Sequence, residues 1–192
     1  NQTDSYAVVS DLTHSKYSVW TFLKCIFDHH DLSGIEEIHV FTDNCAAQFK
    51  SRYVISNLCF LEDDLGLKLT WNHFAASHGK GAVDGVGGVV KGKVWIASKS
   101  RKVVVNSAKD FYECATTECD KINILYTPKE DVEANRSILD ARFSRALEIT
   151  GIQSYHSFRR ADETHVYARQ TAVSKETKIS FTAFSKTETE IY

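Results

Sequence analysis

The sequence predicts an α/β domain with parallel strand pairs. Through residue 95, short apolar runs that are typical of buried strands alternate with segments whose apolar residues recur every three or four positions, as on one face of a helix. The order strand, helix, strand, helix, strand, helix is typical of layered α/β proteins. A chain of 192 residues suits one domain of ordinary size, and 43% hydrophobic with 25% charged residues is typical of a globular protein.

The elements of the first half have distinct signals. The first two strands stop at an acidic residue, Asp11 and Asp43, and the third stops before a glycine-rich segment. Taken as a helix, that segment places valines on one stripe at i, i+3, i+7 and i+11 from Val83. We expect strands at 6–10, 36–42 and 67–74, and helices at 16–28, 46–60 and 83–95.

Beyond residue 100 the elements become shorter. Pro128 suits the first turn of a helix, and Gly151 suits its end. We expect helices at 107–117 and 128–149, and strands at 122–126, 155–158, 166–169 and 179–184. The predicted organisation is a core over residues 1–126, followed by a small α+β appendage over residues 127–192.

The charge distribution limits the classes of partner. A net charge of −2 argues against a protein whose whole surface binds nucleic acid, but residues 78–102 carry six basic side chains against Asp84 alone. No apolar run reaches the ~18 residues of a membrane span, and the N-terminus has no signal-peptide pattern. We therefore expect a local basic surface and no membrane partner.

Cysteine and methionine usage bears on location and completeness. Five cysteines, an odd number without a Cys-x-x-Cys pair, are typical of reduced thiols in an intracellular protein. Methionine is absent even from position 1, and the first residues lead directly into a strand-like run. We therefore expect the sequence to be an internal fragment.

The stretch 71–95 has an unusual composition, with six of the nine glycines between Gly79 and Gly92. Glycine costs backbone entropy in a regular element, so the cluster indicates positive φ angles or the close approach of a backbone or ligand. Its His-Gly-Lys-Gly turn offers backbone N–H groups and an ammonium to a phosphate. Lys80 is a candidate phosphate contact, or else a solvated loop residue. His78 is a candidate neighbour of a metal ion, a candidate phosphate contact or a turn residue.

Two carboxylates next to strand ends predict a metal site. Asp43 ends the second strand and Asp84 lies in the helix after the third, and sites in parallel sheets form at such ends. Mg²⁺ prefers carboxylate oxygens, and two ions about 4 Å apart can activate a water and stabilise a leaving oxygen. Alternatively, Asp43 caps the helix that starts near Ala46, and Asp84 is a cap or pairs with Lys80 or Lys91.

Gln48 and Lys50 open the second expected helix, directly after Asp43. From that position their side chains are candidates for contact with the backbone of a nucleic-acid strand. The alternative is an ordinary place on the surface of the helix.

Three segments resemble a group of mostly uncharacterised, transposon-derived animal proteins. They are Ser10-Asp11-Leu-Thr-His14, Phe41-Thr-Asp43-Asn-Cys-Ala-Ala-Gln48-Phe49-Lys50, and Trp71 through Lys91 with its core Ser77-His-Gly-Lys-Gly-Ala-Val-Asp-Gly-Val-Gly-Gly. The resemblance covers roughly residues 5–125 and extends more faintly to the Tyr155-His-Ser-Phe158 segment and the strands after it. The central region of the group is similar to a ribonuclease-H-like domain of the DDE transposase and integrase kind.

The resemblance implies a fold and an active site. The fold is a ribonuclease-H-like mixed sheet flanked by helices. Asp43 matches the second catalytic acid, after strand 4, and Asp84 matches the third, with Asp where many relatives have Glu. Both would bind Mg²⁺ or Mn²⁺. The first acid should lie upstream of Tyr6, so this fragment lacks the first strands and one carboxylate.

The implied function is metal-dependent phosphoryl transfer on DNA, in a nuclease or strand-transfer reaction. A homo-oligomer, a nuclear location and no small-molecule organic cofactor are also expected. The alternatives are a domesticated domain that binds nucleic acid or protein without catalysis, and a plain α/β interaction module whose acids are caps. The expected substrate contacts are His78, Lys80, Gln48, Lys50 and Lys91.

Overall fold

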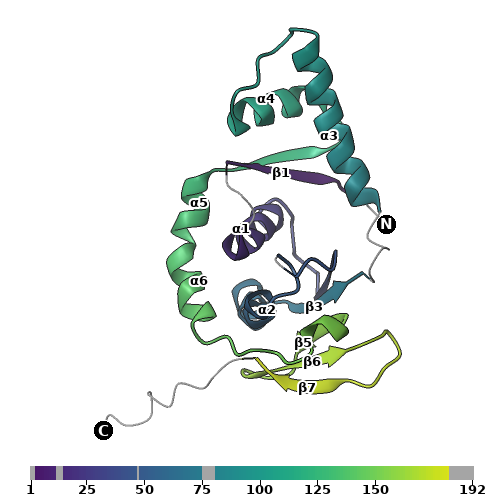
Figure 1. The fold of residues 1–192 in the computed structure, drawn as a ribbon, viewed down its shortest axis with the longest axis vertical. Coiled ribbons are helices and arrows are strands. Elements are labelled where there is room, and N and C mark those ends of the chain that lie inside the picture. Colours follow the sequence, from purple (N-terminus) through teal and green to yellow (C-terminus); the bar gives the residue numbers. More distant parts are fainter. Residues whose placement is uncertain (1–2, 12–14, 47, 75–80, 182–192) are drawn as a thin grey trace. The chain divides into compact units, whose positions relative to one another are not determined.

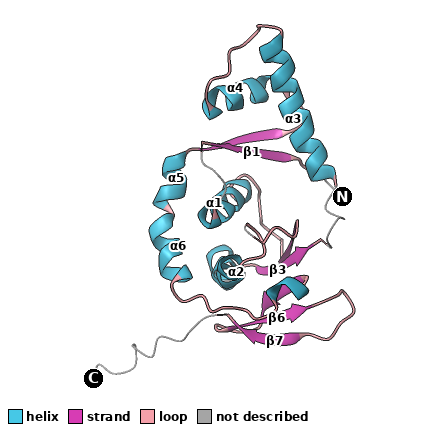
Figure 2. Ribbon diagram, viewed as in Figure 1, coloured by secondary structure: helices cyan, strands magenta, loops and turns pink. Residues whose placement is uncertain are grey.

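The computed structural model describes residues 3–11, 15–46, 48–74 and 81–181. It is an α/β structure with a mixed sheet and flanking helices (Figures 1 and 2), which confirms the general α/β class expected from the sequence. The ribonuclease-H-like arrangement stays a prediction. The chain forms two compact units, each assembled from two separated stretches. Unit 1 combines Asn1–Leu32 with Lys80–Asn135, and unit 2 combines Ser33–Gly79 with Arg136–Tyr192. The domain division after residue 126 stays a prediction.

Unit 1 contains a parallel pair of strands, β1 (Tyr6–Ser10) and β4 (Asn123–Thr127), in which Val8 lies opposite Leu125. Serine caps begin two of its helices, because Ser15 and Ser107 accept hydrogen bonds from backbone N–H groups three residues further on. The helices described in this unit are α1 (Lys16–Phe27), α3 (Ala82–Lys99), α4 (Ala108–Glu118) and α5 (Lys129–Ala134).

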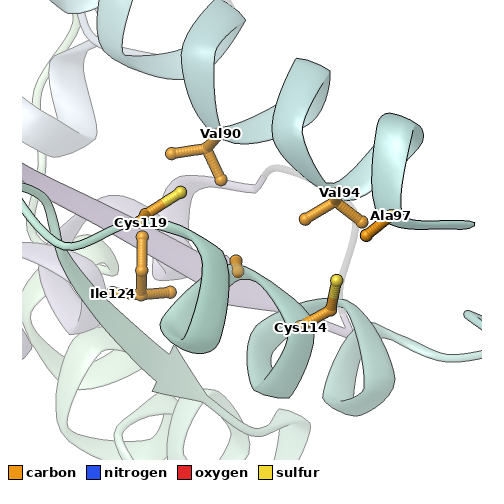
Figure 3. Packing of buried hydrophobic residues seen from close by; sticks show 7 residues of the cluster. Val90, Val94, Ala97, Cys114, Cys119 and Ile124 are labelled. Carbon is orange, nitrogen blue, oxygen red and sulfur yellow. The ribbon is translucent and has the colours of Figure 1, made fainter. Parts of the chain in front are cut away.

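Helix α3 is held by an apolar stripe. Its buried residues Val90, Val94 and Ala97 pack in one cluster with Cys114, Ala115 and Cys119 from the α4 region and Ile124 of β4 (Figure 3). The valine stripe predicted from the sequence is therefore confirmed at Val90 and Val94. It is wrong at Val83, which is 80% exposed in the first turn.

The glycines of α3 are not required by packing. A Cβ atom built on Gly85, Gly87, Gly88 or Gly92 would have no neighbouring atom within 4 Å. The expected close approach of another part of the chain to these glycines is therefore absent from the described residues.

Unit 2 is organised around a five-stranded mixed sheet in the order β2-β3-β5-β6-β7. β2 and β3 are parallel, and every other neighbouring pair is antiparallel. β5 is hydrogen-bonded to β3, so the strands that follow residue 156 extend this sheet. The strands are β2 (Glu37–Thr42), β3 (Lys68–His73), β5 (Ser157–Arg160), β6 (His165–Arg169) and β7 (Thr177–Ser180).

One face of this sheet carries the core of unit 2. Helix α2 (Arg52–Leu65) contributes buried apolar residues, and it contacts β3, β5 and helix α6 (Arg136–Phe143). The strand residues on this face alternate with exposed or half-buried ones, as expected for a sheet with one buried side. The buried apolar residues of unit 2 include Val54, Ile55, Leu58, Leu61, Leu69, Trp71, Phe158, Val166 and Ala168.

Two helix predictions need correction. The second helix begins at Arg52 and not at Ala46, because Ser51 caps it, whereas Cys45 O accepts from the N–H groups of Gln48, Phe49 and Lys50 in a separate turn. The helix expected over 128–149 is two helices, α5 and α6, separated at Asn135. There the Asn135 side-chain amide donates to Asp131 O at 2.9 Å, in competition with the backbone ladder.

Two further observations concern the whole described chain. All five cysteines are free thiols. None of the helices in the described part combines the length and apolar character that crossing a lipid bilayer requires.

The revised start of α2 makes a stability prediction. Ser51→Ala should lower the free energy of unfolding by about 1 kcal/mol, because the side chain accepts from Val54 N–H at the first turn. Urea-induced unfolding followed by circular dichroism measures the change. Ser137→Ala, at an exposed position within α6, is the control and should change the free energy by less than about 0.5 kcal/mol. Equal effects of the two substitutions would contradict the assigned cap.

Candidate functional site

Asp43 lies directly after β2, at the carboxyl end of the parallel β2–β3 pair. The residue is exposed, and its Oδ1 atom accepts a hydrogen bond from the Cys45 backbone N–H at 3.0 Å. This contact closes a local turn. Asp43 does not cap the following helix, which was the alternative considered from the sequence, because Ser51 caps α2. Asp43 therefore presents a carboxylate at the sheet edge where α/β proteins form their sites.

A hydrogen-bond network ties the ends of β2 and β3 beneath Asp43. The Trp71 indole Nε1 donates to Thr42 Oγ1 at 3.1 Å. His73 Nδ1 lies 3.1 Å from the same hydroxyl oxygen and 3.3 Å from the backbone oxygen of Asp43. A carbonyl oxygen can only accept, so the proton of a neutral imidazole sits on Nδ1. The backbone that carries the Asp43 carboxylate is therefore held by two strand ends.

The other ring nitrogen of His73 is buried with its lone pair unused. Nε2 has no hydrogen-bond partner within the residues that the structure describes, and the residue is 5% exposed. Burial lowers the pKa of His73 from 6.5 to about 4, and the positive charge of Lys50 acts in the same direction. His73 is therefore a neutral imidazole at physiological pH.

Lys50 and Gln48 occupy the turn between β2 and α2. The Lys50 side chain is almost fully buried, its Nζ donates to Gln153 O at 2.8 Å, and burial lowers its pKa. This ammonium thus joins two distant parts of unit 2. Gln48 is half-buried, and its backbone N–H donates to Cys45 O. Substrate binding by Lys50 and Gln48 stays a prediction.

Asp84 lies in the first turn of α3 and is exposed. Its Oδ2 atom accepts from the Gly81 backbone N–H at 3.3 Å, so the carboxylate caps the helix that it helps to begin. An acid at this position also interacts favourably with the helix dipole. The capping role considered from the sequence is therefore present, and a metal-binding role stays a prediction.

The basic stretch of α3 is at the surface. Lys91 is exposed, Lys99 Nζ lies 4.5 Å from the centre of the Trp95 ring, and Lys93 Nζ donates to Glu118 O. Trp95 itself is 60% exposed. This side of the helix therefore offers cations and an aromatic ring to a partner.

The two predicted metal-binding carboxylates belong to different units. Asp43 belongs to unit 2 and Asp84 to unit 1, so the convergence of their carboxylates stays a prediction. His78 and Lys80 lie outside the described residues. Over residues 3–11, 15–46, 48–74 and 81–181, no group of three or more His, Cys, Asp and Glu side chains is arranged to hold a metal ion.

His73 is the residue of this region that sequence reasoning missed. Leu69, Trp71 and His73 alternate along β3, and all three are buried. The period of two was visible in the sequence and would have placed the imidazole on the inner face of the sheet. Its contact with the Asp43 carbonyl depends on the strand pairing and could not be read from that period.

The fold and this sheet edge define a protein of the α/β class with a polar site candidate at the carboxyl end of a parallel strand pair. The chain belongs to the family described as a domain of unknown function (DUF8701), which matches residues 1–172. No curated protein and no solved structure matches the chain.

The low pKa of His73 makes the stability depend on pH. The pKa of this imidazole is 6.5 in the unfolded chain and about 4 in the folded one. The free energy of unfolding therefore decreases as the pH drops from 6.5 to 4, and above pH 6.5 this group makes no pH-dependent contribution. The expected loss is at most about 3 kcal/mol. Urea-induced unfolding at pH 7.5 and 4.5 measures it.

His73→Gln should flatten this part of the pH profile, whatever it does to the stability at pH 7.5. His39→Gln is the control, because the His39 side chain is largely exposed, and it should keep the profile of the original protein. Identical pH dependence in the original protein and His73→Gln would show that the buried imidazole is not the titrating group.

Proposed function

We propose that this chain is part of a ribonuclease-H-like, transposase-derived domain that carries out metal-dependent phosphoryl transfer on DNA. The observation that carries the proposal is the position of Asp43. Its exposed carboxylate follows β2, which is paired in parallel with β3, and the network through Thr42 and His73 holds the backbone beneath it. A carboxylate held in this way suits a reaction in which positioning and charge stabilisation supply most of the catalysis.

The donor atoms suit a hard divalent cation. Asp43 and Asp84 each have one carboxylate oxygen engaged by a backbone N–H, and both residues are exposed. Carboxylate oxygens are the protein ligands that Mg²⁺ and Mn²⁺ accept, together with substrate phosphate. Bound there, the metal would activate a water and stabilise the leaving oxygen. The resemblance assigns a third carboxylate to a strand upstream of Tyr6.

The basic side of α3 supports DNA as the substrate class. Lys91 and Lys99 are exposed on the helix whose first turn carries Asp84. Cations near a scissile phosphate neutralise the DNA backbone and release its counterions, so binding should weaken as salt rises.

The second candidate is a domesticated domain that binds nucleic acid or protein without catalysis. The capping bond between Asp84 and Gly81 favours it, because this carboxylate has a structural role that needs no metal. In that case DNA binding should persist in EDTA and survive the loss of either acid.

The two candidates differ in a nicking experiment with supercoiled plasmid DNA. The catalytic proposal predicts that a longer protein, which contains this chain together with the upstream third acid, nicks the plasmid and requires Mg²⁺ or Mn²⁺ to do so. Asp43→Asn or Asp84→Asn should each reduce the rate by at least roughly 100-fold, because each removes a metal ligand worth several kcal/mol to the transition state. Agarose-gel quantification of the nicked form measures the rate.

Asp120→Asn is the matched control, since Asp120 is an exposed aspartate outside the proposed site. It should leave nicking unchanged. Full activity in Asp43→Asn would remove Asp43 from the mechanism. Metal-independent DNA binding without nicking would favour the non-catalytic domain.

A further inference from the structure

The sheet of unit 2 has a second face, opposite to the one that packs on α2. Its side chains form two adjacent rows, since residues paired across strands point to the same side. They are exposed or half-buried, in contrast to the inner face. We call this surface the outer sheet face. One row consists of Phe41, Asn72, Ser157 and Arg169, and the next consists of His39, Thr70, Arg159, Tyr167 and Lys178.

Two phenylalanines are exposed together at one corner of the outer sheet face. Phe41 is 58% exposed and Phe74, directly after β3, is 40% exposed. Their ring centroids lie 5.8 Å apart with an interplanar angle of 28°, so the rings are stacked. The Phe74 backbone N–H donates to Thr42 O at 2.9 Å, which fixes the pair to the strand ends. The corner thus offers a held aromatic surface to a flat partner.

Arginines occupy the middle of the same face and are held in place by their neighbours. The Arg159 guanidinium lies 4.5 Å from the centre of the Tyr167 ring and donates to Glu176 through two nitrogens, at 2.9 and 2.6 Å. Arg169 pairs with the same carboxylate at 2.9 Å. Two guanidinium groups therefore share the Glu176 carboxylate. Glu37, which accepts from Thr70 Oγ1 at 3.0 Å, and Asp162, which pairs with Lys178 at 2.7 Å, are the other carboxylates beside these cations.

We propose that the outer sheet face binds single-stranded nucleic acid. Phe41 and Phe74 would stack on unpaired bases, and Arg159 and Arg169 would contact the phosphates between or beside them. Aromatic rings and guanidinium planes on an open sheet are suited to this ligand, because every unpaired base offers a ring face and every nucleotide an anion. A duplex hides its base faces in the stack, so it cannot use the phenylalanine pair.

The polar side chains between these groups are compatible with the same ligand. Asn72, Ser157 and Thr70 lie between the aromatic corner and the arginines. Thr70 Oγ1 donates to Glu37 and Asn72 Nδ2 donates to backbone carbonyl oxygens, so these side chains offer mainly their oxygen atoms as acceptors for base edges and sugars. The row from Phe41 to Arg169 crosses three strand intervals, which is roughly 14 Å. An interface of that width accommodates more than one nucleotide. The core of a protein–protein interface, in contrast, is mostly apolar and would have few polar groups at these positions.

This inference does not rest on catalysis by Asp43 and Asp84. Phe41 precedes Asp43 by two residues, so a strand bound on the outer sheet face would pass near that carboxylate. Binding itself requires no metal and no intact acid. It can therefore be tested in EDTA with a chain that carries Asp43→Asn and Asp84→Asn together.

The test is fluorescence anisotropy with a labelled mixed-sequence 12-nucleotide single strand, as DNA and as RNA, and with the matching DNA duplex. The single strands should bind in EDTA, and their affinity should fall as salt rises. Phe41→Ala with Phe74→Ala should weaken single-strand binding by roughly 10-fold to 100-fold and leave duplex binding unchanged. Arg159→Ala should also weaken it, whereas Phe41→Tyr, which keeps a stacking ring, should retain binding.

Matched controls separate this face from general surface effects. Val173→Ala removes a side chain that is 95% exposed in the loop between β6 and β7, and Arg136→Ala removes an exposed arginine of α6. Both should bind the single strand as the original chain does, and circular dichroism should show that all variants are folded. Single-strand binding that is absent, or unchanged in the phenylalanine double variant, would overturn the proposal. The proposal would also be overturned if Phe41→Ala abolished self-association or the binding of another protein but left nucleic-acid binding unchanged.

The outcomes remain distinct from those of the nicking experiment. Loss of nicking with preserved single-strand binding would reject the catalytic proposal and leave the outer sheet face as inferred. Metal-dependent nicking, together with single-strand binding that does not change in the Phe41 and Phe74 variants, would support the catalytic proposal and reject the outer sheet face as the binding surface.

Discussion

The two pairings of β3 are the constraint on which unit 2 depends. β3 is parallel to β2 on one side and antiparallel to β5 on the other. Because paired residues share a face, these registers place Trp71 between Val40 and Phe158 on the inner side, and Asn72 between Phe41 and Ser157 on the outer side. A shift of one residue in either register would exchange the two faces.

Burial on the inner face stabilises this arrangement. Leu69, Trp71 and Phe158 are each almost fully buried, and burial of a large apolar side chain is worth about 1.5–3 kcal/mol relative to exposure. Trp71 also donates its indole N–H to Thr42, so its polar atom is satisfied. His73 is the departure from this pattern, since its Nε2 atom lacks a partner among the described residues. The surrounding apolar packing offsets the cost of about 1–3 kcal/mol that an unpaired buried polar atom carries.

The same alternation that forms the core also leaves the outer sheet face and the Asp43 edge available. An exposed carboxylate, Asp43, and the stacked pair of phenylalanines lie at that corner, and the arginines that share Glu176 lie further along the rows of the outer sheet face. Acid residues at the end of α2 are engaged elsewhere, since Asp64 binds Arg142 through two oxygens and Asp63 binds Arg160. These ion pairs join α2 to α6 and β5, so Asp63 and Asp64 have structural partners while Asp43 remains at the surface.

The sequence by itself determined the order of the strands and helices, except for the break at Asn135, and the position of Asp43 at a strand end. Periodicity and local capping, which give these signals, act over a few residues. It predicted β1 and α1 closely, and it placed α3 within a few residues of its observed ends. Only the tertiary structure decided that the C-terminal strands continue the β2–β3 sheet, that Lys50 is buried against Gln153, and that Phe41 stacks on Phe74. These contacts join residues that are distant in the sequence. They depend on strand register and side-chain packing, which leave no short-range signal in the sequence.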